Sequence, residues 1–238
     1  MTRDERDISS PRSMPPEYRA ADLLLESEYT LDHHKAIEIL TELHDNGHRE
    51  SSYTLGWAFY NGIGVEKNTR KAYNFYEKAA SLGEPTAQVL LGQRLANKRG
   101  ATDEDLRRAA DLYRSAAASG SSDACFNLGY CYDIGKGVEK DSVASFLWYH
   151  SAAVLGDVDA ARIVGYCYWT GSGTTEDKAI AMKYYLSAAQ NGDIDAMFNL
   201  ADGYRHFGDV DKSRHWFHVA ASCGSEDAKG ELLELSSH

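Results

Sequence analysis

The sequence predicts an all-α solenoid in which antiparallel helix pairs stack on one another. A glycine that ends a helical pattern recurs about every 36 residues along the chain, and repeats of this length are typical of solenoids. An apolar helical stripe ending in a pair of alanines precedes each of the last five of these glycines. The six glycines are Gly47, Gly83, Gly120, Gly156, Gly192 and Gly224.

The stretch from Ser121 to Gly156 shows the repeating unit most clearly. In its first half, Leu128 and Tyr132 share one face of a predicted helix. Gly129 lies inside this helix, where glycine costs about 1 kcal/mol relative to alanine. This cost indicates that another helix packs against the bare backbone at Gly129. The segment 135–137, Gly-Lys-Gly, then ends the first helix and turns the chain.

The second helix of the same unit starts after this glycine loop. Asp141 or Ser142 can cap its N-terminus. Its apolar face holds a bulky doublet, Trp148 and Tyr149, followed by an alanine pair. The same order of doublet and alanine pair recurs in five repeats, and we therefore expect every repeat to be a helix pair of this kind.

The remaining segments follow from the same pattern. Residues 1–16 are polar and hold three of the four prolines, so we expect a flexible N-terminal arm. Residues 17–238 are expected to form a single repeat domain of about thirteen helices without a sheet. Its first repeat lacks the glycine loop, as capping repeats often do, and its last helix covers the final apolar face. The expected segments are 17–47, 48–83, 84–120, 121–156, 157–192, 193–224 and the capping helix 225–238.

Two copies carry a resemblance to a known family: YTLGWAFYNGIGVEKN (Tyr53–Asn68) and ACFNLGYCYDIGKGVEKD (Ala124–Asp141). The pattern resembles the Sel-one-like repeat (SLR), a relative of the tetratricopeptide repeat, from about Tyr18 to the end of the chain. The resemblance implies a right-handed α-solenoid that serves as a protein-binding scaffold. Two repeats depart from the pattern: the third replaces the G-x-G-V loop with NKRGATDED (Asn97–Asp105), and the sixth has Ala201 for the helix glycine and a shortened loop.

A stripe of aromatic and charged residues runs along the first helices, away from their core face. It occupies the positions three before, one after and four after the helix glycine, or after Ala201 in the sixth repeat. The resemblance places these positions in the concave groove, and tyrosine, tryptophan and arginine are typical of interaction hot spots. The alternative is that the aromatic side chains pack on the preceding repeat. The partner-binding candidates are Tyr53, Trp57, Tyr60, Tyr130, Asp133, Arg162, Tyr166, Trp169, Asp202 and Arg205.

The third repeat interrupts this stripe with Val89, Gln93 and Ala96, so we expect a groove in two halves.

Net charge, apolar runs and cysteine content limit the classes of binding partner and the cellular compartments that we expect for this protein. The formal net charge of −11 disfavours nucleic-acid binding, which normally uses a basic stripe. No apolar run approaches the roughly 18 residues of a membrane span, and the N-terminus does not resemble a signal peptide. The four cysteines, which we interpret as free and mostly buried thiols in a reducing compartment, are Cys125, Cys131, Cys167 and Cys223.

The sequence contains only weak candidates for metal-binding or catalytic motifs. His44 and His48 are four residues apart, but Gly47 ends the helix between them, and His215 and His218 lack a cysteine or carboxylate that would complete a zinc site. Neither a G-x-S-x-G elbow nor a Walker motif occurs. The G-x-G segments recur at the repeat period and are interpreted as turns. We expect no enzyme activity, no cofactor and no metal.

These observations predict a bacterial, cytoplasmic adaptor that binds a partner protein or peptide on the concave face of the solenoid. We expect a monomer or a weak homodimer. An alternative is a dedicated 1:1 regulator or neutraliser, of the immunity type, acting on an enzyme or toxin. A more distant alternative is a hydrolase, which the missing nucleophile and base motifs disfavour.

Overall fold

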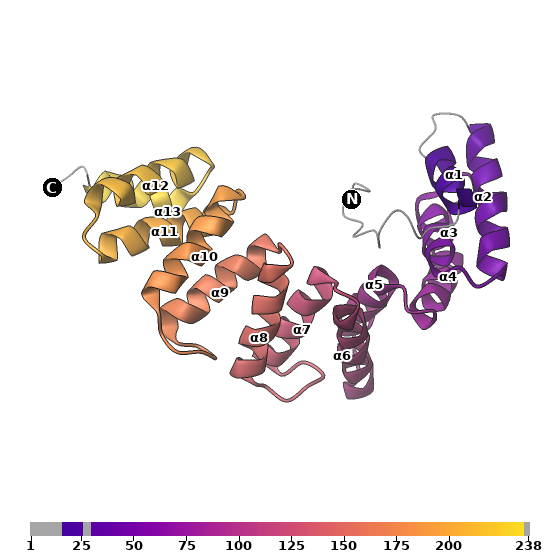
Figure 1. The fold of residues 1–238 in the computed structure, drawn as a ribbon, viewed down its shortest axis with the longest axis horizontal. Helices are drawn as coiled ribbons and strands as arrows, with labels where there is room; N and C mark the ends of the chain where they lie inside the picture. The colour runs from indigo at the N-terminus through magenta and orange to yellow at the C-terminus, as the bar shows by residue number, and fades with distance from the viewer. Residues whose placement is uncertain (1–15, 26–29, 236–238) are drawn as a thin grey trace. The chain divides into compact units, whose positions relative to one another are not determined.

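The computed structural model describes residues 16–25 and 30–235, so nearly all of the predicted N-terminal arm lies outside the described residues. The described chain is helical throughout, with thirteen α-helices and no strand, which confirms the predicted all-α class and helix number (Figure 1). The helices are α1 (Pro16–Leu25), α2 (Thr30–Asp45), α3 (Arg49–Asn61), α4 (Thr69–Ser81), α5 (Pro85–Ala96), α6 (Asp103–Ala118), α7 (Ser122–Ile134), α8 (Ser142–Val154), α9 (Val158–Thr170), α10 (Lys178–Gln190), α11 (Ile194–His206), α12 (Val210–Ser222) and α13 (Glu226–Leu235).

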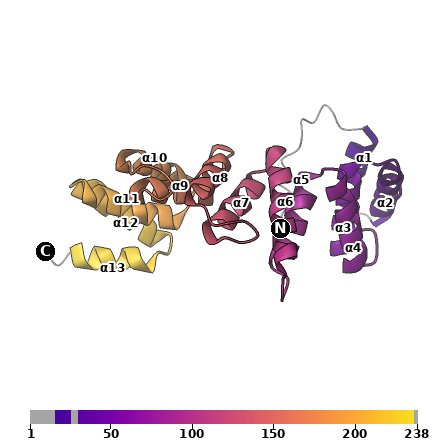
Figure 2. The same cartoon turned by 90° about the horizontal axis from the view of Figure 1, so that it is seen from below.

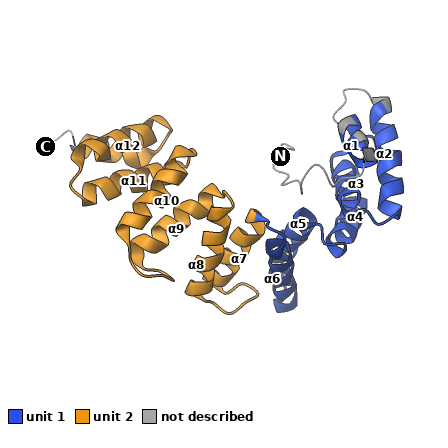
Figure 3. Cartoon of the chain, viewed as in Figure 1, with its two compact units in different colours: residues 1–121 blue, residues 122–238 orange. Residues whose placement is uncertain are grey.

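The chain forms two compact units, residues 1–121 and residues 122–238 (Figure 3). In the first unit α1 to α6 pack in chain order, each helix against the next. In the second unit α7 to α13 do the same, and α13 packs against α12 as the predicted closing helix (Figure 2). Each unit is thus a stack of consecutive helix pairs. The single repeat domain expected over 17–238 stays a prediction.

Side-chain caps begin most of the helices. Asp141 caps α8, because its Oδ1 accepts hydrogen bonds from the amides of Val143 and Ala144 at 2.9 and 3.1 Å. Of the two caps that the sequence allowed there, the structure therefore uses the aspartate. At α6, Thr102 and Asp105 form a reciprocal capping box. Of the three acidic residues at this helix start, Asp105 is the one that takes part in the capping box.

Glycines end the helix pairs. Gly156 and Gly192, for example, have φ values of 97° and 94°, a left-handed conformation that glycine adopts without strain. The chain therefore turns sharply after each second helix and starts the next repeat.

Over the described ranges, no helix combines the length and apolar composition that a membrane crossing requires.

The glycine inside each first helix lies against an aromatic ring of the second helix. A Cβ atom built at Gly129 would lie 2.9 Å from Cδ1 of Tyr149, and one at Gly56 would lie 2.6 Å from Cδ1 of Tyr76. Both tyrosine side chains are buried. The predicted helix contact at Gly129 is therefore confirmed, and it explains why glycine is present despite its low helix propensity.

Candidate functional site

The ten predicted partner-binding residues lie on first helices, and we refer to them as the first-helix face. Three of them lie on α3 in the first unit, and seven lie on α7, α9 and α11 in the second. They are Tyr53, Trp57 and Tyr60 in the first unit, and Tyr130, Asp133, Arg162, Tyr166, Trp169, Asp202 and Arg205 in the second.

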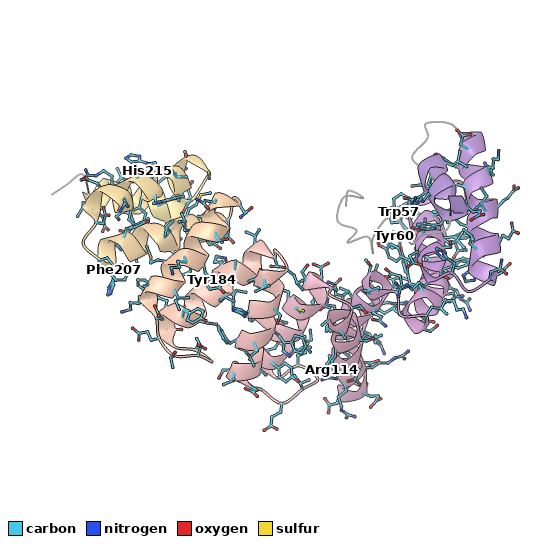
Figure 4. All side chains as sticks on the ribbon, in the orientation of Figure 1. Trp57, Tyr60, Arg114, Tyr184, Phe207 and His215 are labelled. Carbon is cyan, nitrogen blue, oxygen red and sulfur yellow. The ribbon has the colours of Figure 1, made fainter. Side chains whose placement is uncertain are left out.

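The α3 segment of the face contains one exposed and two half-buried aromatic residues. Tyr60 is 43% exposed, with the Nζ of Lys67 5.7 Å from its ring centre. Figure 4 shows Trp57 and Tyr60 projecting from α3. Tyr53 is half-buried, and its ring centre lies 5.6 Å from that of Tyr76 on α4. Tyr53 therefore packs within its own repeat, while Tyr60 remains available to solvent.

Tyr130 on α7 and Tyr166 on α9 are the two most exposed aromatic residues of the second-unit segment. They occupy the same position in consecutive repeats, one residue after the helix glycine, and are 43% and 56% exposed. Ile134, at the end of α7, adds an apolar side chain that is 48% exposed. The stripe pattern missed Ile134 because it lies one residue beyond the periodic position.

Trp169 belongs to a packed aromatic cluster. Its ring centre lies 5.3 Å from that of His206 and 6.5 Å from that of Phe207, both at the end of α11. The Nζ of Lys178 lies 5.4 Å from the Trp169 ring. The tryptophan thus packs on the following repeat. Phe207, labelled in Figure 4, is 55% exposed and was not predicted. Its signal in the sequence is an aromatic residue directly before the helix-ending glycine.

The charged residues of the face are tied to one another and to neighbouring helices. The Nε of Arg162 donates to Asp193 Oδ2 at 3.0 Å, which links α9 to the N-cap of α11. Arg205 forms ion pairs with Asp202 on its own helix and with Glu231 on α13. These contacts fix the positions of the two arginine side chains on the first-helix face.

Asp133 is exposed and forms the acidic end of the α7 segment. Burial, aided by the Asp133 carboxylate, raises the pKa of the Cys167 thiol to about 11. Burial likewise raises the pKa of Cys131. All four cysteines are unpaired; Cys125, Cys131 and Cys167 are buried and Cys223 is exposed. These thiols are therefore structural rather than reactive, except at Cys223.

The histidines considered as metal ligands have local partners or stand apart. His48 Nδ1 accepts the amide of Ser51 and caps α3, and His44 Nδ1 lies 2.8 Å from Ser52 Oγ. His215 is exposed beside the ring of Trp216. Across residues 16–25 and 30–235, histidine, cysteine and carboxylate side chains do not gather in groups of three as metal ligands would.

A second exposed apolar surface lies on α8, outside the first-helix face. Val143, Leu147 and Val154 share one side of this helix and are 55%, 56% and 71% exposed. The sequence signal is that residues 142–154 contain no aspartate, glutamate, lysine or arginine. This surface provides matched control positions for the first-helix face.

Stacked helix pairs joined by glycine turns, with an exposed aromatic surface on the first helices, define an α-helical repeat scaffold suited to protein–protein interaction. Five consecutive segments of the chain match the Sel1 repeat: residues 50–84, 85–121, 122–157, 158–193 and 194–225. The chain belongs to the Sel1 repeat family, a family of non-catalytic scaffolds. The predicted resemblance is confirmed.

Solved structures with the same fold support this assignment. A protective antigen of uropathogenic Escherichia coli that displays an SLR fold matches with a TM-score of 0.80 and 30% identity, over 91% of this chain and 47% of that chain. A Sel1 repeat protein from Oxalobacter formigenes matches with a TM-score of 0.75 and 28% identity, over 92% of this chain and 87% of that one.

A curated relative is similar over a shorter stretch. Chitin synthase regulatory factor 1 of Schizosaccharomyces pombe is 28% identical over 141 residues, which cover 58% of this chain and 31% of the relative. The aligned part of the chain thus spans about a third of that protein's length.

Proposed function

We propose that this protein is a scaffold that binds a segment of a partner protein along its first-helix face. The observation that carries the proposal is the exposure of Tyr130 and Tyr166 at the same position of consecutive repeats. A solenoid presents equivalent positions in a row, and a bound segment can contact both rings along its length. Rigid aromatic side chains lose little conformational entropy on binding and are enriched among interaction hot spots.

Three charged residues of the first-helix face would set the register of the bound segment. Asp133, Asp202 and Arg205 are at least partly exposed, and the Arg205 side chain is held by two carboxylates. Charged groups at the rim of an interface contribute mainly to orientation and partner choice rather than to affinity. We therefore assign binding energy to the aromatic residues and selectivity to these charges.

The test is a parallel capture with three baits from the lysate of the source cells, with partners identified by mass spectrometry. One bait is the natural protein, and the second carries Tyr130→Ser and Tyr166→Ser. A third bait carries Val143→Ser and Leu147→Ser, which remove similarly exposed apolar side chains from α8. Circular dichroism establishes that all three baits are folded.

We expect partners to be lost from the tyrosine variant and kept by the α8 variant. Partners retained by the tyrosine variant would contradict the proposed face, and partners lost only from the α8 variant would move the interface to that helix. Native mass spectrometry of the captured complex then gives its stoichiometry, and the same measurement on the protein alone tests the expected monomer or weak homodimer.

A single tight partner at 1:1 stoichiometry would instead make the protein a dedicated regulator of that partner. The name of the fission yeast relative, a regulatory factor of an enzyme, fits this second outcome. Several weaker partners would support the adaptor role.

We also propose a cytoplasmic location in a bacterial cell. Four unpaired cysteines, three of them buried, suit a reducing compartment, where thiols persist without forming disulfides. Cell fractionation with an antibody against the protein tests this location, and recovery from a periplasmic or membrane fraction would contradict it.

A further inference from the structure

The third repeat lacks a contact that two other repeats make between their glycine loop and the preceding second helix. A Cβ atom built at Gly64 would lie 2.8 Å from the carbonyl oxygen of His33 on α2. One built at Gly173 would meet the carbonyl oxygen of Ser142, at the start of α8. In both repeats the loop therefore covers the first part of the helix before it. By the repeat spacing, the equivalent residue for the third repeat is Thr69 at the start of α4.

The α4 surface that such a loop would cover is open. The third repeat joins α5 to α6 through residues 97–102, without the second loop glycine. A cavity of about 340 Å³ lies there, and a second cavity of about 350 Å³ adjoins it through two shared residues, Glu77 and Arg94. We refer to the two together as the α4–α6 cleft. Its lining residues are Thr69, Arg70, Tyr73, Asn74, Glu77, Leu91, Arg94, Leu95, Lys98, Arg108 and Leu112.

Arg94 is the second irregular feature of this repeat. The other repeats place a small, buried residue at the equivalent position two residues after the helix glycine: Ala58, Cys131, Cys167 and Gly203. Arg94 is instead exposed, and its guanidinium carbon lies 3.6 Å from the ring centre of Tyr73. Stacking on a ring fixes the plane of the guanidinium and leaves its N–H groups free to donate at the edge.

The cleft is basic on a chain whose net charge is −11. Among the described residues, no carboxylate lies within 4.0 Å of the charged nitrogens of Arg70, Arg94 or Arg108. By contrast, Arg107 and Arg114, also on α6, pair with Glu104 and Asp111 at 2.9 and 2.5 Å. The arginines that line the cleft can therefore form ion pairs with a ligand, whereas Arg107 and Arg114 are already paired with carboxylates of the protein.

We propose that the α4–α6 cleft binds an acidic segment of a partner protein. Carboxylates of the segment would pair with Arg70, Arg94 and Arg108, whose forked guanidinium groups match carboxylates with two parallel hydrogen bonds. Apolar side chains between the carboxylates would lie on Leu95 and the other leucines of the cleft. None of the ten residues of the first-helix face lines the cleft, so the proposal is independent of that face.

Glu77 and Lys98 refine the expected ligand. Glu77 lines both cavities, and it would repel a carboxylate bound at their junction. Lys98 is engaged by Asp105 at 3.1 Å, so it contributes less to an anion. We therefore expect acidic side chains toward the ends of the bound segment and an uncharged residue at its middle.

Fluorescence anisotropy with synthetic peptides tests the site directly. The probe is a fluorescein-labelled nonapeptide with two glutamates at each end and leucines between them, and its matched control has glutamines in place of the glutamates. The protein variant carries Arg94→Glu and Arg108→Glu. The control variant carries Arg107→Glu and Arg114→Glu, which make the same charge change on paired arginines outside the cleft (Figure 4 labels Arg114).

We expect saturable binding of the acidic probe that the cleft variant weakens more than about tenfold and the control variant changes less than about threefold. Glu77→Gln should tighten binding, and raising the salt concentration from 50 to 300 mM should weaken it. All variants are exposed helix-surface changes, and circular dichroism verifies their folding. The proposal is overturned by equal binding of the glutamine peptide, by equal loss in the two arginine variants, or by no binding of the acidic probe at 1 mM protein.

Discussion

Gly165 on α9 lies directly against the ring of Tyr185 on α10. A Cβ atom at Gly165 would lie 2.7 Å from both Cδ1 and Cε1 of the ring and 3.3 Å from the carbonyl oxygen of Ala181. The Tyr185 side chain is 3% exposed, so the ring has little room to move. The close approach of the two helices of this repeat therefore depends on the missing side chain at Gly165.

Replacing this glycine by alanine should destabilise the protein although alanine is the better helix former. We expect Gly165→Ala to lower the free energy of unfolding by about 1–3 kcal/mol, the usual cost of overpacking. Gly230→Ala in α13 is the matched control, because nothing in the described chain lies within 4 Å of a Cβ built there. It should raise stability by up to about 1 kcal/mol. Urea unfolding of both variants checks the pair, and equal stability would contradict the packing argument.

Ser213 is a buried hydroxyl whose loss should be tolerated. Its side chain is 1% exposed, and its Oγ has no hydrogen-bond partner in the described part of the chain. Alanine occupies the equivalent position in four other second helices: Ala36, Ala72, Ala109 and Ala181. We expect Ser213→Ala to leave the free energy of unfolding unchanged or to raise it by about 1 kcal/mol, because an unpaired buried polar group is costly.

Ser51→Ala is the control for this prediction. Ser51 is also fully buried, but its Oγ lies 2.7 Å from His48 Nδ1. Its removal should cost about 1 kcal/mol, the typical net worth of a hydrogen bond. A clear loss of stability on Ser213→Ala, measured by thermal or urea unfolding, would show that the hydroxyl has a partner after all.

His48 should make the first unit sensitive to acid. Its Nδ1 accepts the amide of Ser51 as the N-cap of α3, and only the neutral ring can accept this bond. Burial lowers the pKa of His48 below its usual 6.5, an effect that outweighs the opposing influence of the nearby Glu50 carboxylate. The unfolded chain therefore takes up a proton at a higher pH than the folded chain, and stability falls as pH falls below the unfolded value.

The comparison for His48 is the variant His48→Asn, which keeps a capping side chain but does not titrate. Relative to this variant, the natural protein should lose up to about 1 kcal/mol of stability between pH 7.5 and pH 5, the usual worth of an N-cap. Urea unfolding across this pH range measures the difference. A difference that stays constant with pH would contradict the role of His48.

The four thiols should differ sharply in reactivity. Cys223 is exposed, whereas the other three are buried with raised pKa values, about 11 for Cys167. We expect one thiol to react rapidly with Ellman's reagent at pH 8 and three to react at least about tenfold more slowly, because the thiolate is the reactive form. Cys223→Ser should abolish the rapid phase, and denaturation should release all remaining thiols. A rapid phase that survives in this variant would contradict the buried state.

Predictions from the sequence succeeded for local features and for the pairing of helices. The sequence predicted a cap at Asp141 or Ser142 and a helix packed against the backbone of Gly129, and the structure has both features. The sequence predicted less well which aromatic side chains of the stripe are exposed to solvent. Tyr53 and Trp169 share the periodic stripe with Tyr130, yet both are half-buried against other aromatic rings. Helical periodicity gives the direction of a side chain from its own axis, but not what the neighbouring helix places there.

The sequence by itself determined the class of protein, because glycine turns, caps and alanine–aromatic faces act within one or two helices. Their geometry follows from the helix repeat and from steric limits at each residue. Only the tertiary structure decided that Tyr130 and Tyr166 stay exposed and that Arg94 borders an open cleft. Both features depend on how the loops and side chains of adjacent repeats fill space. In two other repeats a glycine loop covers the start of the preceding second helix, and the third repeat has a different loop there, which leaves its cleft open.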